Sequence, residues 1–321
     1  MANNDLVLGI DIGGTKTAFG FVDIKGKLTC ATTMPTQSHD SAKTLVYRLH
    51  KRIEKARVGL PPSHRLCGIG VGAPNAHHYR GTIEKAVNLN WGETIDFVGL
   101  IRKHYDVPVS LTNDANAAAL GEMLFGNARG MKHFLVITLG TGLGSGIVAD
   151  GHLIHGASGF AGELGHIVVD PDGRQCGCGK RGCLETYVSA TGLIRTTAEL
   201  LAHRLDPSPL RVMCYHKITA KHIFDLAAKG DLIALAAFDQ TARILGMKLA
   251  DAVAHTSPEA IFFSGGMAAA GDLLLKPTQR YMEDFLFGAY RGTVKLMPSG
   301  MKAGKSAILG AAALIWHELA H

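Results

Sequence analysis

The chain has 321 residues, of which 47% are hydrophobic and 19% charged, and this balance is typical of a folded soluble protein with about two domains or one large α/β unit. Its net charge of +6 is spread along the sequence, which argues against a nucleic-acid-binding surface and supports only a mild attraction for anionic substrates. No apolar run approaches the roughly 18 residues that span a membrane.

A glycine turn between two strands opens the chain. The apolar run over residues 6–10 predicts a buried strand that ends at Asp11, and a second strand covers residues 17–22, after the turn at Gly13 and Gly14. A carboxylate at a strand end, followed by small and hydroxyl residues, can hold hydrated Mg²⁺ and offer backbone N–H groups to a phosphate. An ordinary hairpin with a diglycine turn is the alternative.

The same arrangement recurs about 125 residues later. An apolar strand over residues 134–139 is followed by Gly-Thr-Gly-Leu-Gly-Ser-Gly and a second strand. Two such units predict two related lobes across a cleft, each offering backbone N–H groups to a polyphosphate. Ser264, Gly265 and Gly266 follow another buried strand and form a turn suited to the sugar or base of a nucleotide.

Helical periodicity and capping residues predict helices in the rest of the chain, between further short strands. Ser38 and Asp40 are available to cap the first helix, and Thr219 caps a later one. The predicted helices cover residues 41–57, 94–105, 189–203, 220–229, 231–255 and 305–319.

Asn113 and Asp114 follow a predicted strand and open a helix. Both residue types are favoured helix N-caps. A carboxylate projected from a strand end into a cleft could equally act as a general base. The local sequence leaves both interpretations open.

Three cysteines and a histidine predict a metal site. Cys176, Cys178 and Cys183 lie within eight residues, and His166 is ten positions before the first of them. Three thiolates and an imidazole form a complete tetrahedral set for structural Zn²⁺, with no position left for a catalytic water. A disulfide framework in a secreted protein is the alternative, but three cysteines leave one unpaired and the N-terminal residues do not resemble a signal peptide.

Two carboxylates, Glu163 and Glu185, flank this set, so fixing the metal ligands would also fix both of them. The other cysteines, Cys30, Cys67 and Cys214, are scattered. They are typical of small apolar residues in a reduced, cytoplasmic protein.

Taken in order, the motifs resemble the ROK family (repressor, open reading frame, kinase) of bacterial sugar kinases, and its glucokinases most closely. The motifs are DIGGTKT, NDAN, TLGTGLGSGI, the pattern E-x-x-H followed by C-x-C-G-x-x-G-C-x-E, and SGG. The cysteine pattern is highly specific, whereas the glycine turns are shared across actin-like ATPases. The family's repressor branch carries a DNA-binding segment ahead of the kinase fold. Because the first strand here begins at Leu6, no such segment is expected.

The resemblance implies an α/β, actin-like (ribonuclease H-like) fold with two lobes, a central ATP and sugar cleft and a small zinc-bound loop. The small lobe would comprise residues 1–112 and the C-terminal helix 305–321, and the large lobe residues 113–304 with the zinc motif 162–185. A homodimer is also implied, with no nucleic-acid or membrane partner.

The resemblance also assigns roles to residues. Asp114 would be the catalytic base that takes the proton of the sugar hydroxyl attacking the γ-phosphate of ATP. The sugar hydroxyls would be bound by Asn88, Asn113, Glu163, His166 and Glu185. The phosphates and Mg²⁺ would be held by Asp11, Gly13, Gly14, Thr15, Lys16, Gly140, Thr141 and Gly142, with Ser264, Gly265 and Gly266 near the adenosine. The structural Zn²⁺ would be held by His166, Cys176, Cys178 and Cys183.

His166 therefore has two implied roles, because one ring nitrogen can bind zinc while the other presents its N–H to the sugar. The alternatives are a zinc ligand without substrate contact for His166, and a surface partner of Lys180 or Arg181 for Glu185.

The implied reaction is ATP-dependent phosphorylation of glucose to glucose 6-phosphate. Within the same family, the alternatives are N-acetylglucosamine, N-acetylmannosamine or mannose as substrate and polyphosphate as donor. A sugar sensor without turnover would not need Asp114. A zinc-knuckle nucleic-acid binder would need more basic and aromatic residues around the cysteines.

Overall fold

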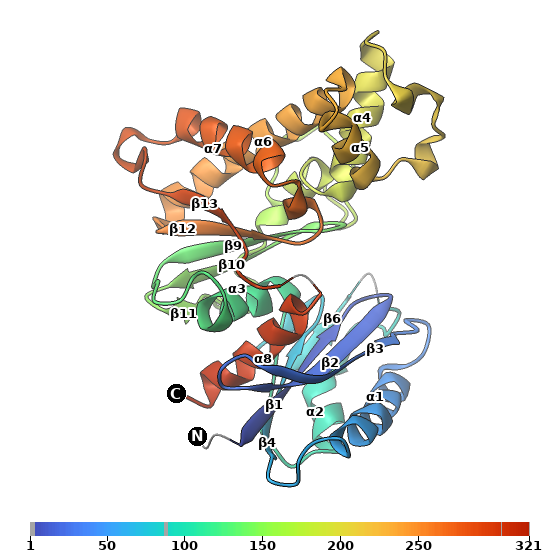
Figure 1. The fold of residues 1–321 in the computed structure, drawn as a ribbon, viewed down its shortest axis with the longest axis vertical. Coiled ribbons are helices and arrows are strands. Elements are labelled where there is room, and N and C mark those ends of the chain that lie inside the picture. Colours follow the sequence, from blue (N-terminus) through green and yellow to red (C-terminus); the bar gives the residue numbers. More distant parts are fainter. Residues whose placement is uncertain (1–3, 87–88, 303, 321) are drawn as a thin grey trace. The chain divides into compact units, whose positions relative to one another are not determined.

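The computed structural model describes residues 4–86, 89–302 and 304–320 (Figure 1). Contacts within the chain define two compact units. The first unit comprises Met1–Met131, Leu153–Gly162 and Ser299–His321, and the second comprises Lys132–His152 and Glu163–Pro298. Each unit is built around a five-stranded sheet, so the chain has the mixed α/β architecture that its motifs predicted.

The sheet of the first unit has the strand order β3-β2-β1-β4-β8. Its strands are β1 (Asp5–Ile12), β2 (Lys16–Asp23), β3 (Leu28–Pro35), β4 (Arg65–Gly72) and β8 (Val109–Thr112). β1, β2 and β3 are antiparallel neighbours, whereas β4 runs parallel to β1 and β8 parallel to β4. The first glycine turn therefore belongs to a hairpin, as predicted, and the carboxyl ends of β1, β4 and β8 lie at one edge of the sheet.

Helices cover both faces of this sheet because successive side chains of a strand point to opposite faces. Leu8 belongs to the core formed with α1 (Ala42–Arg57) and α2 (Phe97–Arg102). Its neighbour Val7 belongs to the core formed with α8 (Ser306–Glu318). The continuous apolar run in β1 thus serves two separate cores.

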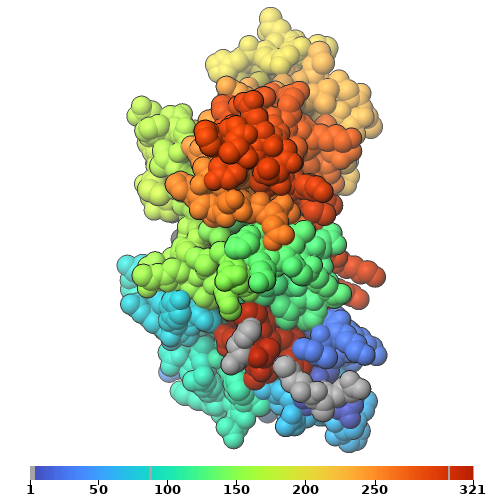
Figure 2. Space-filling model, turned by 90° about the vertical axis from the view of Figure 1, so that its left-hand side faces the viewer, coloured from blue at the N-terminus to red at the C-terminus, as the bar shows by residue number. Residues whose placement is uncertain are grey.

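α8 approaches the sheet closely where the strands carry glycine. A Cβ on Gly9 would lie 2.2 Å from the carbonyl oxygen of Ile308, and one on Gly70 would lie 1.8 Å from that of Ala311. In the space-filling view, red atoms of the C-terminal segment are visible among blue and cyan atoms of the first unit (Figure 2). Because α3 (Asp114–Phe125) packs against α8, the first unit continues past residue 112, where the expected boundary lay.

A small antiparallel sheet completes the first unit. It consists of β5 (Ala76–His77), β6 (Thr82–Glu84) and β7 (Thr94–Asp96). The helix predicted from residue 94 is therefore wrong at its start, because residues 94–96 pair with β6. α2 begins only after Asp96, whose Oδ1 accepts the backbone N–H of Gly99 at 2.8 Å.

The sheet of the second unit repeats the order of the first, β11-β10-β9-β12-β13. β9 and β10 form the second glycine hairpin, and β12 and β13 extend the sheet in parallel. The strands are β9 (Phe134–Leu139), β10 (Leu143–Ala149), β11 (His152–Leu153), β12 (Ala260–Ser264) and β13 (Lys295–Pro298). The two related units that the repeated motif predicted are thus present.

Four α-helices, labelled in Figure 1, pack in the second unit. They are α4 (Ala190–His203), α5 (Ala220–Ala227), α6 (Leu232–Thr256) and α7 (Asp272–Phe285). Short 3₁₀ helices are η1 (Leu164–His166), η2 (Leu184–Thr186), η3 (Pro209–Val212), η4 (Tyr215–Lys217), η5 (Met267–Ala270) and η6 (Gly288–Tyr290). Within the described ranges, no helix is both long enough and apolar enough to cross a bilayer.

Helix caps follow the predictions in one case and correct them in another. Thr219 caps α5, because its hydroxyl oxygen accepts the backbone N–H of His222 at 3.2 Å. α1 is capped by Ser41, whose oxygen accepts the N–H of Thr44 at 3.1 Å, and not by Ser38 or Asp40. A cap must lie immediately before the first helical turn, and only Ser41 has that position.

Candidate active site and metal centre

Thr36 braces the hairpin turn formed by residues 13–16. Its hydroxyl donates to the carbonyl oxygen of Gly13 at 2.6 Å, and its backbone N–H donates to that of Thr15 at 2.9 Å. The turn is closed by the N–H of Gly13, which donates to the carbonyl of Lys16 at 2.9 Å. Thr36 lies at the end of the neighbouring strand, and no local sequence signal pointed to it.

Asp11 and Asp114 come together at the carboxyl ends of the parallel strands. Gly72, the last residue of β4, lies between them, because a Cβ there would be 3.9 Å from Oδ1 of Asp11 and 4.0 Å from Cα of Asp114. Burial and the charge of Asp114 raise the pKa of Asp11 to about 7. Two carboxylates at one strand edge, both oxygen donors, suit a hydrated Mg²⁺ ion.

The Asp114 side chain combines solvent access with a raised pKa. Surrounding protein raises the pKa of its carboxyl by desolvation, and the N–H of Ala115, 2.8 Å from Oδ1, opposes that rise. The residue is nevertheless exposed to solvent. An accessible carboxylate that binds a proton more readily than usual has the properties of a general base.

Of the two asparagines predicted to bind the sugar, the structure describes only Asn113. Asn113 is buried and caps α3, and its Oδ1 accepts the backbone N–H of Asn116 at 2.7 Å. This cap leaves its Nδ2 amide group for a ligand. Asn88 lies outside the described residues.

The second glycine turn, residues 140–142, lies against Glu185. The N–H of Gly140 donates to the carbonyl of Gly142 at 3.0 Å and closes the turn. A Cβ on Gly142 would lie 2.6 Å from Oε2 of Glu185. A residue expected to bind phosphate and one expected to bind sugar are therefore direct neighbours within the second unit.

The structure brings together the four predicted metal ligands His166, Cys176, Cys178 and Cys183, here called the Cys/His cluster. Their ligand atoms all lie within 4.8 Å of one another. Sγ of Cys178 is 3.6 Å from that of Cys183, and Sγ of Cys176 is 3.7 Å from Nδ1 of His166. Tetrahedral Zn–S bonds of about 2.3 Å separate two sulfurs by roughly 3.8 Å, so the side chains fit a zinc ion.

The electrostatics of the cluster also favour a cation. All of its cysteines are free thiols. Burial raises the pKa of Cys176 and of Cys183, whereas hydrogen bonds such as that from the backbone of Lys180 lower the pKa of Cys178. A nearby positive ion would favour the thiolate forms of Cys176 and Cys183. The turn that carries them is closed by the N–H of Cys176, which donates to the carbonyl of Lys180 at 2.9 Å.

His166 lies between the two predicted sugar-binding glutamates. Its Nδ1 faces the thiols and is 3.7 Å from Oε1 of Glu185, whereas its Nε2 is 4.0 Å from Oε2 of Glu163. The ring therefore has one nitrogen on each side, as its double role requires. Lys180 and Arg181 donate to the backbone carbonyls of His166 and Gly173, which does not support the alternative in which they pair with Glu185.

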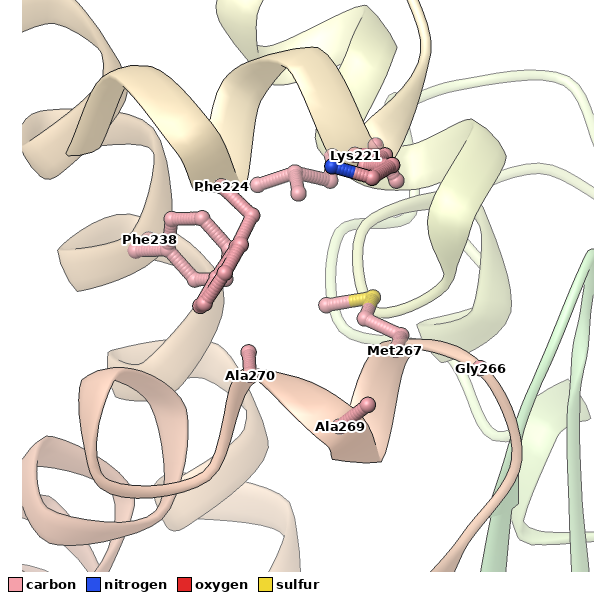
Figure 3. Close-up of a pocket in the computed structure, with 9 residues that line it drawn as sticks. Lys221, Phe224, Phe238, Gly266, Met267, Ala269 and Ala270 are labelled. Atoms are coloured by element: carbon pink, nitrogen blue, oxygen red, sulfur yellow. The ribbon is translucent and has the colours of Figure 1, made fainter. Parts of the chain in front are cut away.

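A cavity of about 330 Å³ opens beside the turn that follows β12. Gly265 in this turn has a φ of +91°, and a Cβ there would lie 2.4 Å from the carbonyl oxygen of Leu139. Figure 3 shows the side chains of Lys221, Phe224 and Met267 around the cavity. Its volume is in the range of small-molecule pockets. Of the predicted adenosine residues, Gly266 lines it directly.

The apolar lining of this cavity was not predicted from the sequence. The lining residues are Leu193, Ala220, Lys221, Phe224, Phe238, Gly266, Met267, Ala269 and Ala270. Except for Lys221 and Gly266, these positions are apolar residues of ordinary type, so only their convergence in space distinguishes them.

Comparisons with known proteins agree with this architecture. The model of the ROK family matches residues 7–318. A glucokinase from Halalkalibacterium halodurans is 39% identical over 87% of this chain and 85% of its own length, and a glucokinase from Thermotoga maritima is 33% identical over 96% of both. The crystal structure of a ROK family glucokinase from Streptomyces griseus in complex with glucose and AMPPNP has a TM-score of 0.80 and 34% identity, and the match covers 96% of this chain and 98% of that one. The chain belongs to the ROK family.

Proposed function

We propose that this protein is an ATP-dependent glucokinase that converts glucose to glucose 6-phosphate. The observation that carries the proposal is the pair of carboxylates, Asp11 and Asp114, at the carboxyl ends of the parallel strands. This pair occurs in a chain whose relatives include glucokinases at 39% and 33% identity. A further relative, the ROK family glucokinase from Streptomyces griseus, was crystallised with glucose and AMPPNP.

Asp114 is the general base of the proposed reaction. Its carboxylate takes the proton of the glucose 6-hydroxyl as that oxygen bonds to the γ-phosphorus and the bond to the β–γ bridging oxygen breaks, releasing ADP. Base catalysis of this kind contributes roughly 10²- to 10⁴-fold in rate. The remainder comes from alignment and from stabilisation of the phosphoryl charge.

The two glycine turns are the proposed phosphate-binding elements. Residues 13–16 and 140–142 offer backbone N–H groups, and Thr15, Lys16 and Thr141 add exposed side chains. Mg²⁺, when bound beside Asp11, supplies positive charge that neutralises the phosphoryl oxygens. The raised pKa of Asp11 supports this role, because a carboxylate that is costly to ionise alone is well suited to share a cation.

Glu163, Glu185 and His166 are proposed to bind the sugar hydroxyls, together with Asn113 and Asn88. Zinc would be held by the Cys/His cluster as a structural ion, fixing the ring of His166 through Nδ1. Nε2 would then carry the proton and donate to a hydroxyl, with Glu163 accepting beside it.

The cavity beside Gly266 is proposed to hold the adenine base, with Ser264 and Gly265 near the ribose. Phe224 and Met267 offer apolar contact to a flat ring, and polyphosphate would make no use of such a pocket. We further propose that the fold is of the actin-like class with the two units as its lobes. A cytoplasmic location fits a cluster that requires reduced thiols.

The proposal is tested by measuring ADP release from ATP and Mg²⁺ with glucose, mannose, N-acetylglucosamine and N-acetylmannosamine as acceptors. Glucose is expected to give the highest kcat/KM, and Asp114→Asn is expected to lower kcat by at least about 100-fold. Asp106→Asn, an exposed aspartate of the same unit, is the matched control. Glucose binding without turnover in the parent protein would favour the sensor alternative, and full activity of Asp114→Asn would remove the proposed base.

A further inference from the structure

Arg174 has all five of its N–H donors engaged, although it lies in the loop just before the first cysteine. Nε and Nη2 donate to the carboxylate of Glu199 at 2.9 and 2.6 Å, and Nη2 also donates to the hydroxyl of Thr196 at 2.9 Å. Nη1 donates to the carbonyl oxygens of Thr186 at 2.7 Å and Gly192 at 3.2 Å. An arginine offers five N–H donors in a fixed planar fork, so this environment is matched to the guanidinium group.

The same side chain is enclosed by Tyr187. The guanidinium carbon lies 4.4 Å from the centre of the Tyr187 ring, and the tyrosine hydroxyl accepts the backbone N–H of Arg174 at 3.1 Å. Arg174 is only 11% exposed, whereas its ionic partner Glu199 is 56% exposed. The contacts of Arg174 with the two carbonyls and with the Tyr187 ring are therefore less exposed to solvent than its ion pair with Glu199. These contacts hold the arginine against residues 183–192.

The first half of residues 183–192 belongs to the proposed metal and sugar sites. Cys183 is a ligand of the Cys/His cluster. Two residues later, Oε1 of Glu185 lies 3.0 Å from Sγ of Cys176. Arg174 binds the carbonyl of Thr186, the residue immediately after Glu185.

The second half of the segment is bonded to the phosphate turn. The N–H of Ala190 donates to the carbonyl oxygen of Gly140 at 2.9 Å, and the hydroxyl of Thr191 donates to that of Thr141 at 2.8 Å. Arg174 binds the carbonyl of Gly192, the residue that follows Thr191. Its two carbonyl contacts thus bracket the stretch that joins Glu185 to the turn at residues 140–142.

We propose that Arg174 is a positioning residue that holds residues 183–192 as one rigid piece and thereby sets the glucose contact of Glu185 and the ATP-phosphate turn together. This proposal rests on the proposed function of the same site. Arg174 need not touch either substrate, since it acts through the backbone that carries their ligands. Removing the contacts of Arg174 should therefore weaken the binding of glucose and of ATP together. A defect confined to one substrate site would weaken the binding of only one of them.

The test compares Arg174→Met and Arg174→Lys with the parent enzyme. Methionine keeps the unbranched stem and removes every donor, whereas lysine keeps the charge but not the planar fork. Arg195→Met is the matched control, because Arg195 also joins α4 to the cysteine loop but is exposed and makes one bond, to the carbonyl of Gln175 at 3.2 Å. The readouts are kcat, the KM for glucose, the KM for ATP and zinc per chain.

Arg174→Met is expected to raise both KM values by at least about tenfold, as the loss of several charged hydrogen bonds implies, with zinc content and kcat close to those of the parent. The KM values of Arg174→Lys should lie between those of Arg174→Met and the parent, and the KM values of Arg195→Met should equal those of the parent. Unfolding of part of the sample would lower kcat and leave both KM values unchanged, so the KM values separate positioning from simple destabilisation. If Arg174→Met does not fold, Arg174→Lys decides by the same criteria.

Three results would overturn the proposal: parental KM values in a folded, zinc-containing variant, a rise in only one of the two KM values, or a rise that follows zinc loss in proportion. The parent enzyme tests the proposed function in the same assay. Parental turnover of glucose with unchanged KM values in the variants would remove only the role of Arg174. If the parent enzyme did not turn over glucose, both the proposed function and this inference would be refuted.

Discussion

Replacing Gly142 by alanine is expected to weaken glucose binding while leaving the protein folded. The new Cβ would lie 2.6 Å from Oε2 of Glu185, whereas ordinary van der Waals contact begins at 3.4 Å. The carboxylate must therefore retreat by the difference, about 0.8 Å. Because it is the end of a flexible side chain, the retreat costs only about 1 kcal/mol of stability.

The same displacement is costly for the ligand. A hydrogen bond between a carboxylate and a sugar hydroxyl is worth about 1.5–3 kcal/mol, so its loss raises the dissociation constant for glucose by roughly 10- to 100-fold. Calorimetric titration with glucose measures this constant, and scanning calorimetry on the same samples measures Tm.

The control is Gly288→Ala, also in the second unit, where an added Cβ would meet no atom within 4 Å. It is expected to match the parent in both measurements. Parental glucose affinity in Gly142→Ala would refute the reasoning, because it would show that the position of the Glu185 carboxylate does not matter to the sugar. Weak binding together with a large fall in Tm would instead mean that the turn itself had collapsed.

Three further outcomes are expected. Cys178→Ser should lower zinc per chain, measured by atomic emission, and raise the KM for glucose, because the Cys/His cluster fixes His166; a zinc-free variant with a normal KM would contradict this. Phe224→Ala should raise the KM for ATP by roughly tenfold through lost stacking, with the KM for glucose unchanged, and equal changes in both would argue against a base pocket. The acid limb of kcat/KM should lie above pH 3.8, the ordinary pKa of aspartate, because Asp114 must be deprotonated and its pKa is raised; an acid limb at the ordinary value would show that the carboxylate is not perturbed.

The features predicted correctly from the sequence are those encoded by residues close together in the chain. The strand-turn-strand pattern around Gly13 and Gly14 predicts a hairpin because only a few residues separate its two strands. The three cysteines converge because eight residues of a glycine-rich loop cannot place them far apart. His166 joins them because the intervening segment folds back on itself, where Val168 pairs with Cys183.

Predictions from the local sequence were wrong where a residue's neighbours in the folded chain decide its conformation or its place in the fold. Residues 94–96 have a sequence compatible with a helix, yet they become a strand because β6 offers an open edge to pair with. Likewise, α3 follows directly on β8, but its place in the first unit is decided by packing on α8, from the far end of the chain.

The sequence by itself determined that the chain carries two glycine hairpins, a candidate zinc set and a carboxylate opening a helix, since each depends on spacing within one short segment. Only the tertiary structure decided that Gly72 lies between Asp11 and Asp114, that Gly142 lies against Glu185, and that Arg174 binds two backbone carbonyls within residues 183–192. These contacts join segments that only the packing of the folded chain brings together. Which residues meet in these contacts depends on the shape and polarity of the folded core, and a local sequence pattern does not contain that information.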